Sequence, residues 1–196
     1  MNQYFKNISI IRTGHVFRSK IPYDTNGNIN LLNMDTISST GIVRISEADI
    51  KKIQLDNIKP EEVIMPGDIL FKAKGLNNTA VLIDSIPPNT TVTASCHIIR
   101  VADKNFLPEY ICFWLNSAAA KKHFSKGTGR VTGVTIANVS KATLETLEIP
   151  LFPLKNQKLI SEIEECSKQE KELLLKIAEK KEMLNRAIIE KELQKY

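Results

Sequence analysis

Three groups of basic and amide side chains along this chain could bind a nucleic acid. Lys and Arg anchor phosphates, while Asn and Arg can read base edges in the major groove. Glycines beside them let backbone amides approach a phosphate closely. The candidate DNA-binding residues are Lys72, Lys74, Asn77 and Asn78 around Gly75; Lys126, Thr128 and Arg130 among the glycines of 127–133; and Arg12 and Arg18 early in the chain.

No motif in the sequence predicts a catalytic centre. His15, His97 and His123 are isolated and lack metal-ligand spacing. The sequence has no phosphate-binding loop of the Walker type and no nucleophile elbow. We therefore expect no catalytic residue, no metal site and no cofactor, and we interpret the three histidines as surface or structural residues.

A metal-dependent nuclease is the enzymatic alternative. Asp68 followed by Lys72-Ala73-Lys74 has an order of acid and lysine that is similar to the arrangement in many such enzymes. Those sites need a second carboxylate to help hold the divalent cation. Here Lys72 stands two residues before Lys74, where its positive charge would repel the metal, so the chemistry disfavours this alternative.

Composition and charge set the class of protein. The 196 residues are 42% hydrophobic and 25% charged, with a formal net charge of +5, which permits a polyanionic partner. We find no apolar run long enough to cross a bilayer and no signal-peptide pattern, so we expect no membrane association. The three cysteines form no CxxC pair, which favours a reducing cytoplasm.

Most of the chain reads as an α+β domain rich in strands. Asp24-Thr25-Asn26-Gly27 predicts a tight turn before a strand, and the turn at 65–68 precedes the apolar run 69–71. Further strands are predicted at 81–83, 92–94 and 98–101. One helix is predicted from Pro108 to about Phe124, with Trp114 as a core anchor.

The last part of the chain, residues 155–196, lacks Gly and Pro and predicts one long helix that pairs with another helix. Its apolar residues recur three, four or seven positions apart, close to a coiled-coil seam, although Glu170 and Lys180 interrupt it. A helix of about 40 residues would be about 60 Å long, so its apolar stripe needs a partner outside its own domain. The predicted dimerisation residues are Leu159, Ile163, Leu173, Ile177, Leu184 and Ile188.

The order of short motifs resembles one known family. The motifs are Gly14-His-Val-Phe-Arg18, Gly27-Asn-Ile-Asn-Leu-Leu32, Pro66-Gly-Asp-Ile-Leu-Phe71, Leu107-Pro-Glu-Tyr-Ile111, Gly127-Thr-Gly129, and Leu147-Glu-Ile-Pro-Leu-Phe-Pro-Leu154 followed by Gln157. Together they resemble the specificity (S) subunit of a Type I restriction-modification system, in its half-length form with a single target-recognition domain. Asn156 departs from the acidic residue that is usual there, but Asn can also cap a helix.

The resemblance implies an architecture and partners. It implies that 1–154 is a target-recognition domain for double-stranded DNA, and that 155–196 is a helix for dimerisation and for docking a modification methyltransferase subunit. It implies pairing with a second copy or a second half-length S subunit, because full-length members carry two such domains and two long antiparallel helices. It also implies a non-catalytic role, since the partner subunits do the chemistry.

A second interpretation keeps this architecture and changes the role. The chain could be a regulatory or anti-restriction mimic that binds methyltransferase through its helix without useful DNA specificity. Basic residues in all three candidate groups argue against a DNA mimic, which would be acidic.

Overall fold

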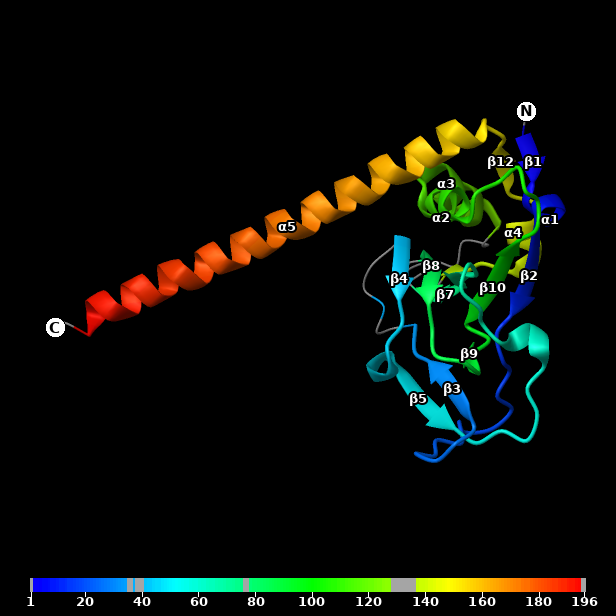
Figure 1. The fold of residues 1–196 in the computed structure, drawn as a ribbon, viewed down its shortest axis with the longest axis horizontal. Helices are drawn as coiled ribbons and strands as arrows, with labels where there is room; N and C mark the ends of the chain where they lie inside the picture. Colours follow the sequence, from blue (N-terminus) through cyan, green and yellow to red (C-terminus); the bar gives the residue numbers. More distant parts are fainter. Residues whose placement is uncertain (1, 35–36, 38–40, 76–77, 128–136, 195–196) are drawn as a thin grey trace. The chain divides into compact units, whose positions relative to one another are not determined.

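Apolar residues in five segments build a central sheet in the order β2, β10, β6, β8, β4 (Figure 1). The first four strands pair antiparallel, and β4 pairs parallel with β8. Both faces of the sheet are buried, because successive residues of a strand point to opposite faces and nearly all of them are apolar here. The bounds are β2 Ser9–Thr13, β4 Gly41–Arg44, β6 Ile69–Lys72, β8 Ala80–Ser85 and β10 Cys96–Val101.

The computed structural model describes residues 2–34, 37, 41–75, 78–127 and 137–194. Contacts divide the chain into two units, Met1–Lys158 and Leu159–Tyr196. The first unit is α+β and rich in strands, and the chain ends in a long helix, so the predicted fold class is confirmed. None of the helices in the described ranges is long and apolar enough to cross a membrane.

One face of the central sheet packs against a smaller sheet of β5 (Ile50–Ile53), β3 (Ile29–Leu32) and β9 (Thr90–Val92). Leu70, Val81 and Ile98 of the central sheet form a cluster there with Leu32 and Val92. The predicted turn before β3 is confirmed, because Asp24 accepts hydrogen bonds from the backbone amides of Asn26 and Gly27. The predicted strand at 92–94 lies two residues earlier than expected, at β9.

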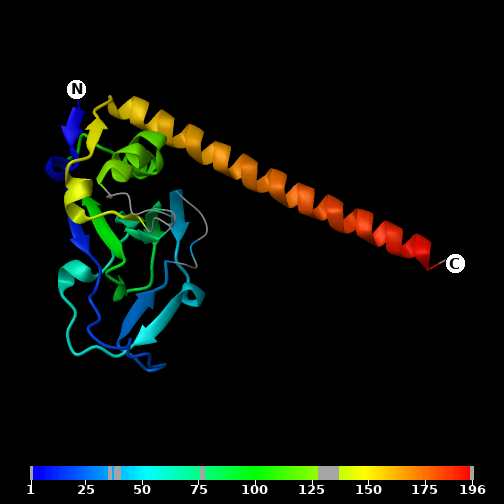
Figure 2. The ribbon, with the colours of Figure 1, turned by 180° about the vertical axis from the view of Figure 1, so that it is seen from behind.

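Helices cover the other face, and in Figures 1 and 2 the central sheet lies between α2 and α3 on one side and β3 and β5 on the other. Tyr110, Ile111 and Leu115 of α2 are buried, and the ring of Phe124 in α3 meets Phe71 of β6 edge-on, with centroids 5.3 Å apart. The bounds of the helices in this unit are α1 Phe5–Ile8, α2 Pro108–Asn116, α3 Ala118–Gly127 and α4 Lys141–Glu145, with short 3-10 turns η1 Glu47–Asp49 and η2 Pro60–Glu62.

The prediction of one helix from Pro108 to Phe124 is wrong in one respect, because two helices occupy this range. Ser117 between them is extended, with a ψ of 157°, and its hydroxyl accepts a hydrogen bond from the amide of Ala120 in α3. The side chain of Asn116 bonds both the amide and the carbonyl of Ala80 on β8. These polar contacts end α2 and start α3 in a new direction, and an apolar-periodicity argument does not detect them.

Trp114 is half-buried, so the prediction of a core anchor is only partly correct. Its indole Nε1 donates a hydrogen bond to the carbonyl of Glu148, 3.1 Å away. The fully buried ring of α2 is Tyr110, whose hydroxyl donates to the carbonyl of Pro150 at 2.9 Å. Both bonds tie α2 to β12 (Glu148–Pro150), which pairs antiparallel with β1 (Asn2–Tyr4).

The long helix α5 runs from Leu154 to Leu193, one residue before the predicted start of the helical segment. Its first turn belongs to the globular unit, where the side chain of Gln157 is fully buried. Gln157 Oε1 accepts from the amide of Leu107 at 2.9 Å, and Nε2 donates to the carbonyls of Asn105 and Phe152 at 2.7 and 2.8 Å. The residues predicted for dimerisation on α5, Leu159, Ile163, Leu173, Ile177, Leu184 and Ile188, are 53–61% exposed.

Candidate nucleic-acid interface

Two short strands bring Lys74, a member of the first predicted DNA-binding group, next to Asn138. β7 (Lys74–Gly75) pairs antiparallel with β11 (Ala137–Asn138), which places Lys74 opposite Asn138. Just beyond this pair, the amide of Val139 donates to the carbonyl of Ala73 at 2.9 Å. Lys74 and Asn138 are both exposed, so a cation and an amide stand side by side on this edge.

The helices α3 and α4 carry two further exposed lysines. Lys126, in the last turn of α3, is exposed and lines a shallow hollow of about 390 Å³ together with Ala142 and Thr143 of α4. His123 Nε2 lies 3.0 Å from the carbonyl of Thr143 and joins the two helices. Lys141, which precedes Ala142, is exposed and lies 3.7 Å from Glu145. We call Lys74, Lys126, Asn138 and Lys141 the basic frame.

The basic frame flanks the stretch that holds two of the predicted contacts. Thr128 and Arg130 lie outside the described residues, as does Asn77. On either side of this stretch, α3 ends at Gly127, one residue after Lys126, and β11 places Asn138 opposite Lys74. The pairing of β7 with β11 therefore makes Lys74 and Asn138 neighbours, although they lie far apart in the sequence.

Lys72 and Asn78 differ from the other predicted residues in having a defined structural setting. Lys72, the last residue of β6, is half-buried, and a Cβ at Gly75 would lie 3.4 Å from its Cε. Gly75 has a φ of 132°, which only glycine adopts readily. Asn78 donates its amide hydrogens to the carbonyls of Lys72 and Ala73, at 3.0 and 2.9 Å, so its nitrogen holds the turn together.

The third predicted group is linked to the frame through the turn between β9 and β10. The carbonyl of Ser95 accepts from the amides of Ala73 and Lys74, and the carbonyl of Cys96 accepts from Gly14. A Cβ on Gly14 would lie 2.5 Å from the carbonyl oxygen of Thr93, so only glycine fits this close approach. Arg12 lies on β2 opposite Ile98 and is half-buried, and Arg18 is exposed in the segment that follows.

A buried histidine supports the frame from below. His97 on β10 is 5% exposed, and its Nε2 lies 3.0 Å from the carbonyl of Val139, next to Asn138. A carbonyl only accepts, so Nε2 carries the proton in this bond. Burial lowers the pKa of His97, outweighing its backbone hydrogen bonds to Val139 and Arg12, and the positive charge of Lys141 lowers it further. The neutral ring thus fastens the Val139 segment to the central sheet.

Asp68, the acid of the nuclease alternative, is committed to a structural ion pair. Its carboxylate is 1% exposed and accepts two bonds from Arg100, Nε to Oδ1 and Nη2 to Oδ2, each 2.7 Å long. The amide of Met65 donates a third bond at 2.8 Å, and the Asp68 hydrogen bond raises the pKa of the Arg100 guanidinium. No cluster of three metal-ligating side chains occurs in the described ranges. Asp68 therefore has a partner other than a metal.

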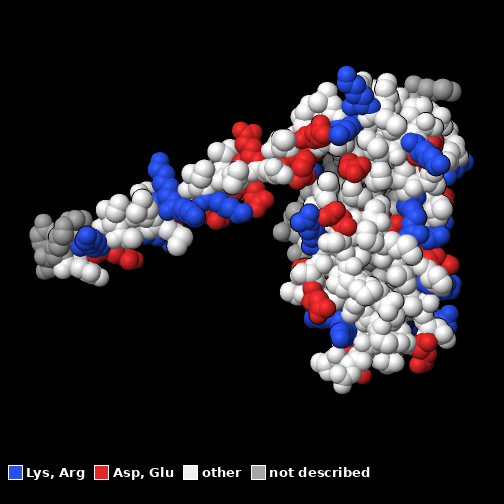
Figure 3. All heavy atoms as spheres, in the orientation of Figure 1, with Lys and Arg blue, Asp and Glu red and all other residues white. Residues whose placement is uncertain are grey.

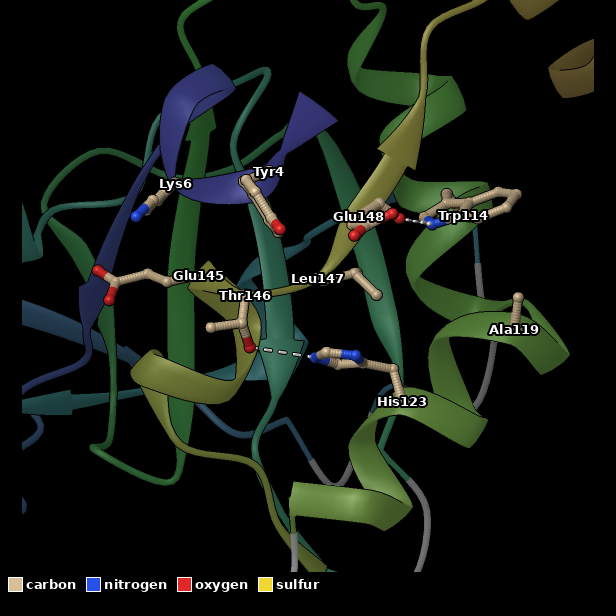
Figure 4. Close-up of a pocket in the computed structure, with 9 residues that line it drawn as sticks. All are labelled: Tyr4, Lys6, Trp114, Ala119, His123, Glu145, Thr146, Leu147 and Glu148. Atoms are coloured by element: carbon tan, nitrogen blue, oxygen red, sulfur yellow. Dashed lines mark hydrogen bonds between the residues drawn. The ribbon is translucent and has the colours of Figure 1, made fainter. Parts of the chain in front are cut away.

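A larger hollow lies on the helical side of the unit. It measures about 700 Å³ and is lined by Trp114, His123, Glu145, Glu148 and residues around them (Figure 4). His123 Nε2 reaches Thr146 Oγ1 at 3.3 Å across its floor. The hydrogen bonds of His123 to Thr146 and Thr143 hold α3 against α4, and they therefore help to position Lys126 at the end of α3.

Charge is distributed locally rather than over a broad patch. On the face of the globular unit drawn in Figure 3, basic and acidic side chains are interspersed. A uniform basic surface would attract any polyanion, whereas clustered cations beside an amide can combine phosphate and base contacts. The case for a nucleic-acid interface therefore depends on the geometry of the basic frame.

Sequence reasoning missed Asn138 and Lys141. A signal was present, because Ser140 is a residue type favoured at helix N-caps, and its Oγ does accept a hydrogen bond from the amide of Thr143 at 3.1 Å. A turn that caps a helix directly after the glycine-rich stretch would have marked these side chains. The pairing of β7 with β11 could not be predicted, because each strand has only two residues and the two lie far apart in the sequence.

Comparison with known proteins places the chain among DNA-specificity proteins by sequence. Residues 5–176 match the family described as Type I restriction modification DNA specificity domain. This range includes the basic frame and more than half of α5. No curated protein matches the chain.

Two solved structures have similar folds. The HsdS subunit from Thermoanaerobacter tengcongensis matches with a TM-score of 0.57 at 15% identity, over 87% of this chain and 37% of that one. A chain from a structural study of complex assembly and conformational transition in a type I R-M system matches with a TM-score of 0.55 at 15% identity, over 87% and 38%. At this identity the likeness concerns the fold, and the chain spans less than two fifths of the length of either match.

Proposed function

We propose that this chain, which belongs to the family of Type I restriction modification DNA specificity domains, reads double-stranded DNA and recruits a modification methyltransferase. The single observation that carries the proposal is the basic frame, in which Lys74 lies opposite the exposed Asn138 on paired strands. The exposed Lys126 and Lys141 lie in the last turn of α3 and the first turn of α4, two helices that line one hollow. Such a set suits a DNA site, because lysines bind phosphates and an asparagine can bond the N6 and N7 edge of adenine.

The two units would have separate roles. Residues 1–154 would act as the target-recognition domain, and 155–196 would form the helix for dimerisation and docking. The dimer partner is a second copy or a second half-length S subunit. The exposed apolar seam of α5, between 53 and 61% exposed at the predicted positions, supports a helix partner.

The methyltransferase would dock on the opposite side of α5. Leu175 and Ile189 lie 14 residues apart, which is two heptads, and are 56 and 59% exposed. Leu175 follows Leu173 by two residues, or about 200° around a helix, so it faces away from the seam. Glu182 occupies the heptad position between them, so these two apolar residues would give α5 two separate contact points on the side away from the seam.

We propose a non-catalytic role for this chain, in which the partner subunit carries out methyl transfer. We also propose a cytoplasmic location, because the DNA that the complex would bind lies there. The bidentate bond from Arg100 to Asp68 disfavours the nuclease alternative. The cations of the basic frame disfavour an anti-restriction mimic, because DNA mimicry requires negative charge. If the purified protein with Mg²⁺ cleaved unmethylated DNA, a non-catalytic role would be wrong.

Salt-dependent retardation of DNA tests the interface. Lys126→Ala and Lys74→Ala, each assembled with the methyltransferase, should weaken retardation of target DNA. Removal of one phosphate-binding lysine should reduce the slope of log K against log salt by about 0.9. Lys104→Ala is the matched control, because Lys104 is equally exposed but lies between β10 and α2.

The variant Asn138→Ala distinguishes contacts to DNA bases from contacts to DNA phosphates. It should leave the salt slope unchanged and reduce the preference for target over non-target DNA, by about 10-fold if the amide makes one bidentate bond to a base. Unchanged binding by all three frame variants, with the same slope as Lys104→Ala, would place the DNA elsewhere on the protein.

A further inference from the structure

Two charged residues interrupt the apolar seam of α5. Glu170 and Lys180 occupy seam positions, since they continue the three- and four-residue spacing of their apolar neighbours. Elsewhere on α5, acids and bases pair along the helix four residues apart, as Glu164–Lys168, Glu172–Lys176 and Glu182–Arg186. Among the described residues, neither Glu170 nor Lys180 has an ion-pair partner. Both charges are therefore available to a second helix.

The charges distinguish between two orientations of a pair of identical helices. In a parallel pair each seam residue meets the same residue of the partner, so Glu170 meets Glu170 and Lys180 meets Lys180. Like charges would repel at both levels. In an antiparallel pair whose two-fold axis lies at the level of residue 175, Glu170 of each helix meets Lys180 of the other.

We infer that α5 pairs antiparallel with α5 of a second copy of this chain, in the register centred on residue 175. The inference rests on the proposed dimer, whose antiparallel orientation the family resemblance already implies, and adds the identical partner and the register. In this register Leu173 packs on the partner's Ile177, Cys166 on the partner's Leu184, and Ile163 on the partner's Ala187. Leu159 meets the partner's Lys191 at each end, where the lysine stem can cover it while its ammonium reaches water.

A separate set of residues favours the same register. Ile160, Leu174 and Ile188 form an apolar flank beside the seam. Ile188 is one of the predicted dimerisation residues, and it lies on this flank because the seam position beside it is Ala187. Flank residues contact the partner residue two positions before the one at their own level. With the axis at residue 175, Ile160 therefore faces the partner's Ile188, and Leu174 faces the partner's Leu174. A shift of one heptad in either direction instead places Lys181 against Ile160 or Leu174. The same shift places Lys180 against Ile163 or Ile177, where its charge would be buried without a partner.

The opposite flank of the seam is polar and has less influence on the register of the pair. Lys176 lies near the partner's Lys176, but its Nζ is 2.7 Å from Glu172 of its own helix, which offsets the repulsion. Glu162 approaches the partner's Glu190 near each end. Exposed charges of this kind contribute little to stability, so the seam and the apolar flank set the register.

Disulfide formation can report the register directly. Cys166 is exposed, whereas Cys96 and Cys112 are buried. In the full chain, oxidation with copper–phenanthroline should crosslink Leu184→Cys, because Cys166 faces the partner's position 184. Ile177→Cys and Lys191→Cys are matched controls, since each would face Cys166 only after a shift of one heptad. Both should run as monomers on a denaturing gel without reductant.

Other crosslinking patterns would overturn the inference. Efficient dimers of the wild-type chain through Cys166 alone would indicate a parallel pair. A control that crosslinks faster than Leu184→Cys would indicate a displaced register. The absence of a crosslink in Leu184→Cys would mean that this seam does not pair with a second copy.

Charge exchange provides a test without cysteines. Glu170→Lys and Lys180→Glu each create two like-charged layers, and each should raise the dimer Kd about 100-fold. The double variant Glu170→Lys/Lys180→Glu restores opposite charges and should dimerise like the wild type. A double variant as weak as the singles, or singles as strong as the wild type, would contradict the register.

The outcome is separable from that of the proposed function. DNA retardation with the methyltransferase, measured on the frame variants, does not depend on the register of α5. If Leu184→Cys does not crosslink but DNA retardation still depends on Lys126, only the register of α5 is refuted. A failure of the retardation assay with a specific 166–184 crosslink removes the DNA-reading role and leaves the dimer.

Discussion

At the residue scale, polar side chains that are buried (His97, Asp68) or half-buried (Asn78) hold the backbone of the globular unit through hydrogen bonds. His97 bonds the carbonyl of Val139 beneath the basic frame, Asn78 ties the turn after Lys72, and Asp68 accepts from Arg100. In the described ranges, every buried side-chain nitrogen and oxygen has a hydrogen-bond partner. Such full satisfaction makes each of these residues costly to change, because its removal leaves another buried group unpaired.

The buried imidazole of His97 predicts a pH dependence of stability. Its pKa in the folded protein lies below the usual value of 6.5, chiefly because burial disfavours the charged ring. The unfolded chain therefore binds more protons below about pH 6.5, and the free energy of unfolding should fall as the pH falls through this value towards the folded pKa. Urea denaturation between pH 5 and pH 8, as approximate limits, measures it.

His97→Gln isolates this contribution, since glutamine can still donate to the carbonyl of Val139 but does not titrate. The variant should lose part of the acid-side slope and keep the same dependence as the wild type above about pH 7.5. Parallel curves for the two proteins throughout the range would refute the assignment.

At the element scale, the junction between the globular unit and α5 is fixed by a buried amide. Gln157 accepts one backbone bond and donates two, to segments that precede α2 and α5. Tyr110 bonds Pro150 beside it, and burial raises the pKa of Tyr110 to about 12. These contacts fasten α2, β12 and the first turn of α5 into one unit.

Removal of the Gln157 side chain should therefore destabilise the globular unit. Gln157→Ala leaves the Leu107 amide and two carbonyls without these bonds, and should lower the free energy of unfolding by about 2–3 kcal/mol. Gln169→Ala is the control, because Gln169 is exposed on α5 and bonds Glu165 of its own helix. Its effect should stay within about 0.5 kcal/mol. Equal stability of the two variants in urea would contradict the role of Gln157.

At the scale of the whole molecule, the chain combines a folded unit with a helix whose apolar residues are largely exposed. Leu173 and Ile177 are 59 and 61% exposed, and Leu175 is 56% exposed on the opposite side. Exposed area of this kind is stabilised by association rather than by the fold of the chain itself. Oligomeric state is therefore the property that these residues should control.

Leu173→Glu/Ile177→Glu should give a folded monomer, because charges would enter the centre of the seam. Sedimentation measures the mass and circular dichroism checks that the globular unit is intact. Leu175→Glu has similar exposure but faces away from the seam, so it should remain dimeric and lose methyltransferase binding. A dimeric Leu173→Glu/Ile177→Glu variant would exclude the seam as the interface.

Local patterns predicted much of the fold. Runs of apolar residues in segments such as 69–71 and 98–101 were enough to identify β6 and β10, since they reflect burial on both faces of a sheet. The turn at Asp24 and the long helix could likewise be identified, because capping and helical periodicity act over a few residues. The break at Ser117 was missed, because the contacts of Asn116 that cause it are made to Ala80 on a distant strand.

The sequence by itself determined which residue types could bind DNA and that the chain ends in a long helix with an apolar stripe. Only the tertiary structure decided that Lys74 lies across from Asn138, because strand pairing joins positions 64 residues apart. It also decided that Asp68 belongs to Arg100 rather than to a metal, and that Asn78 holds a turn. These outcomes depend on which backbone groups meet in space, and residue spacing along the chain does not contain that information.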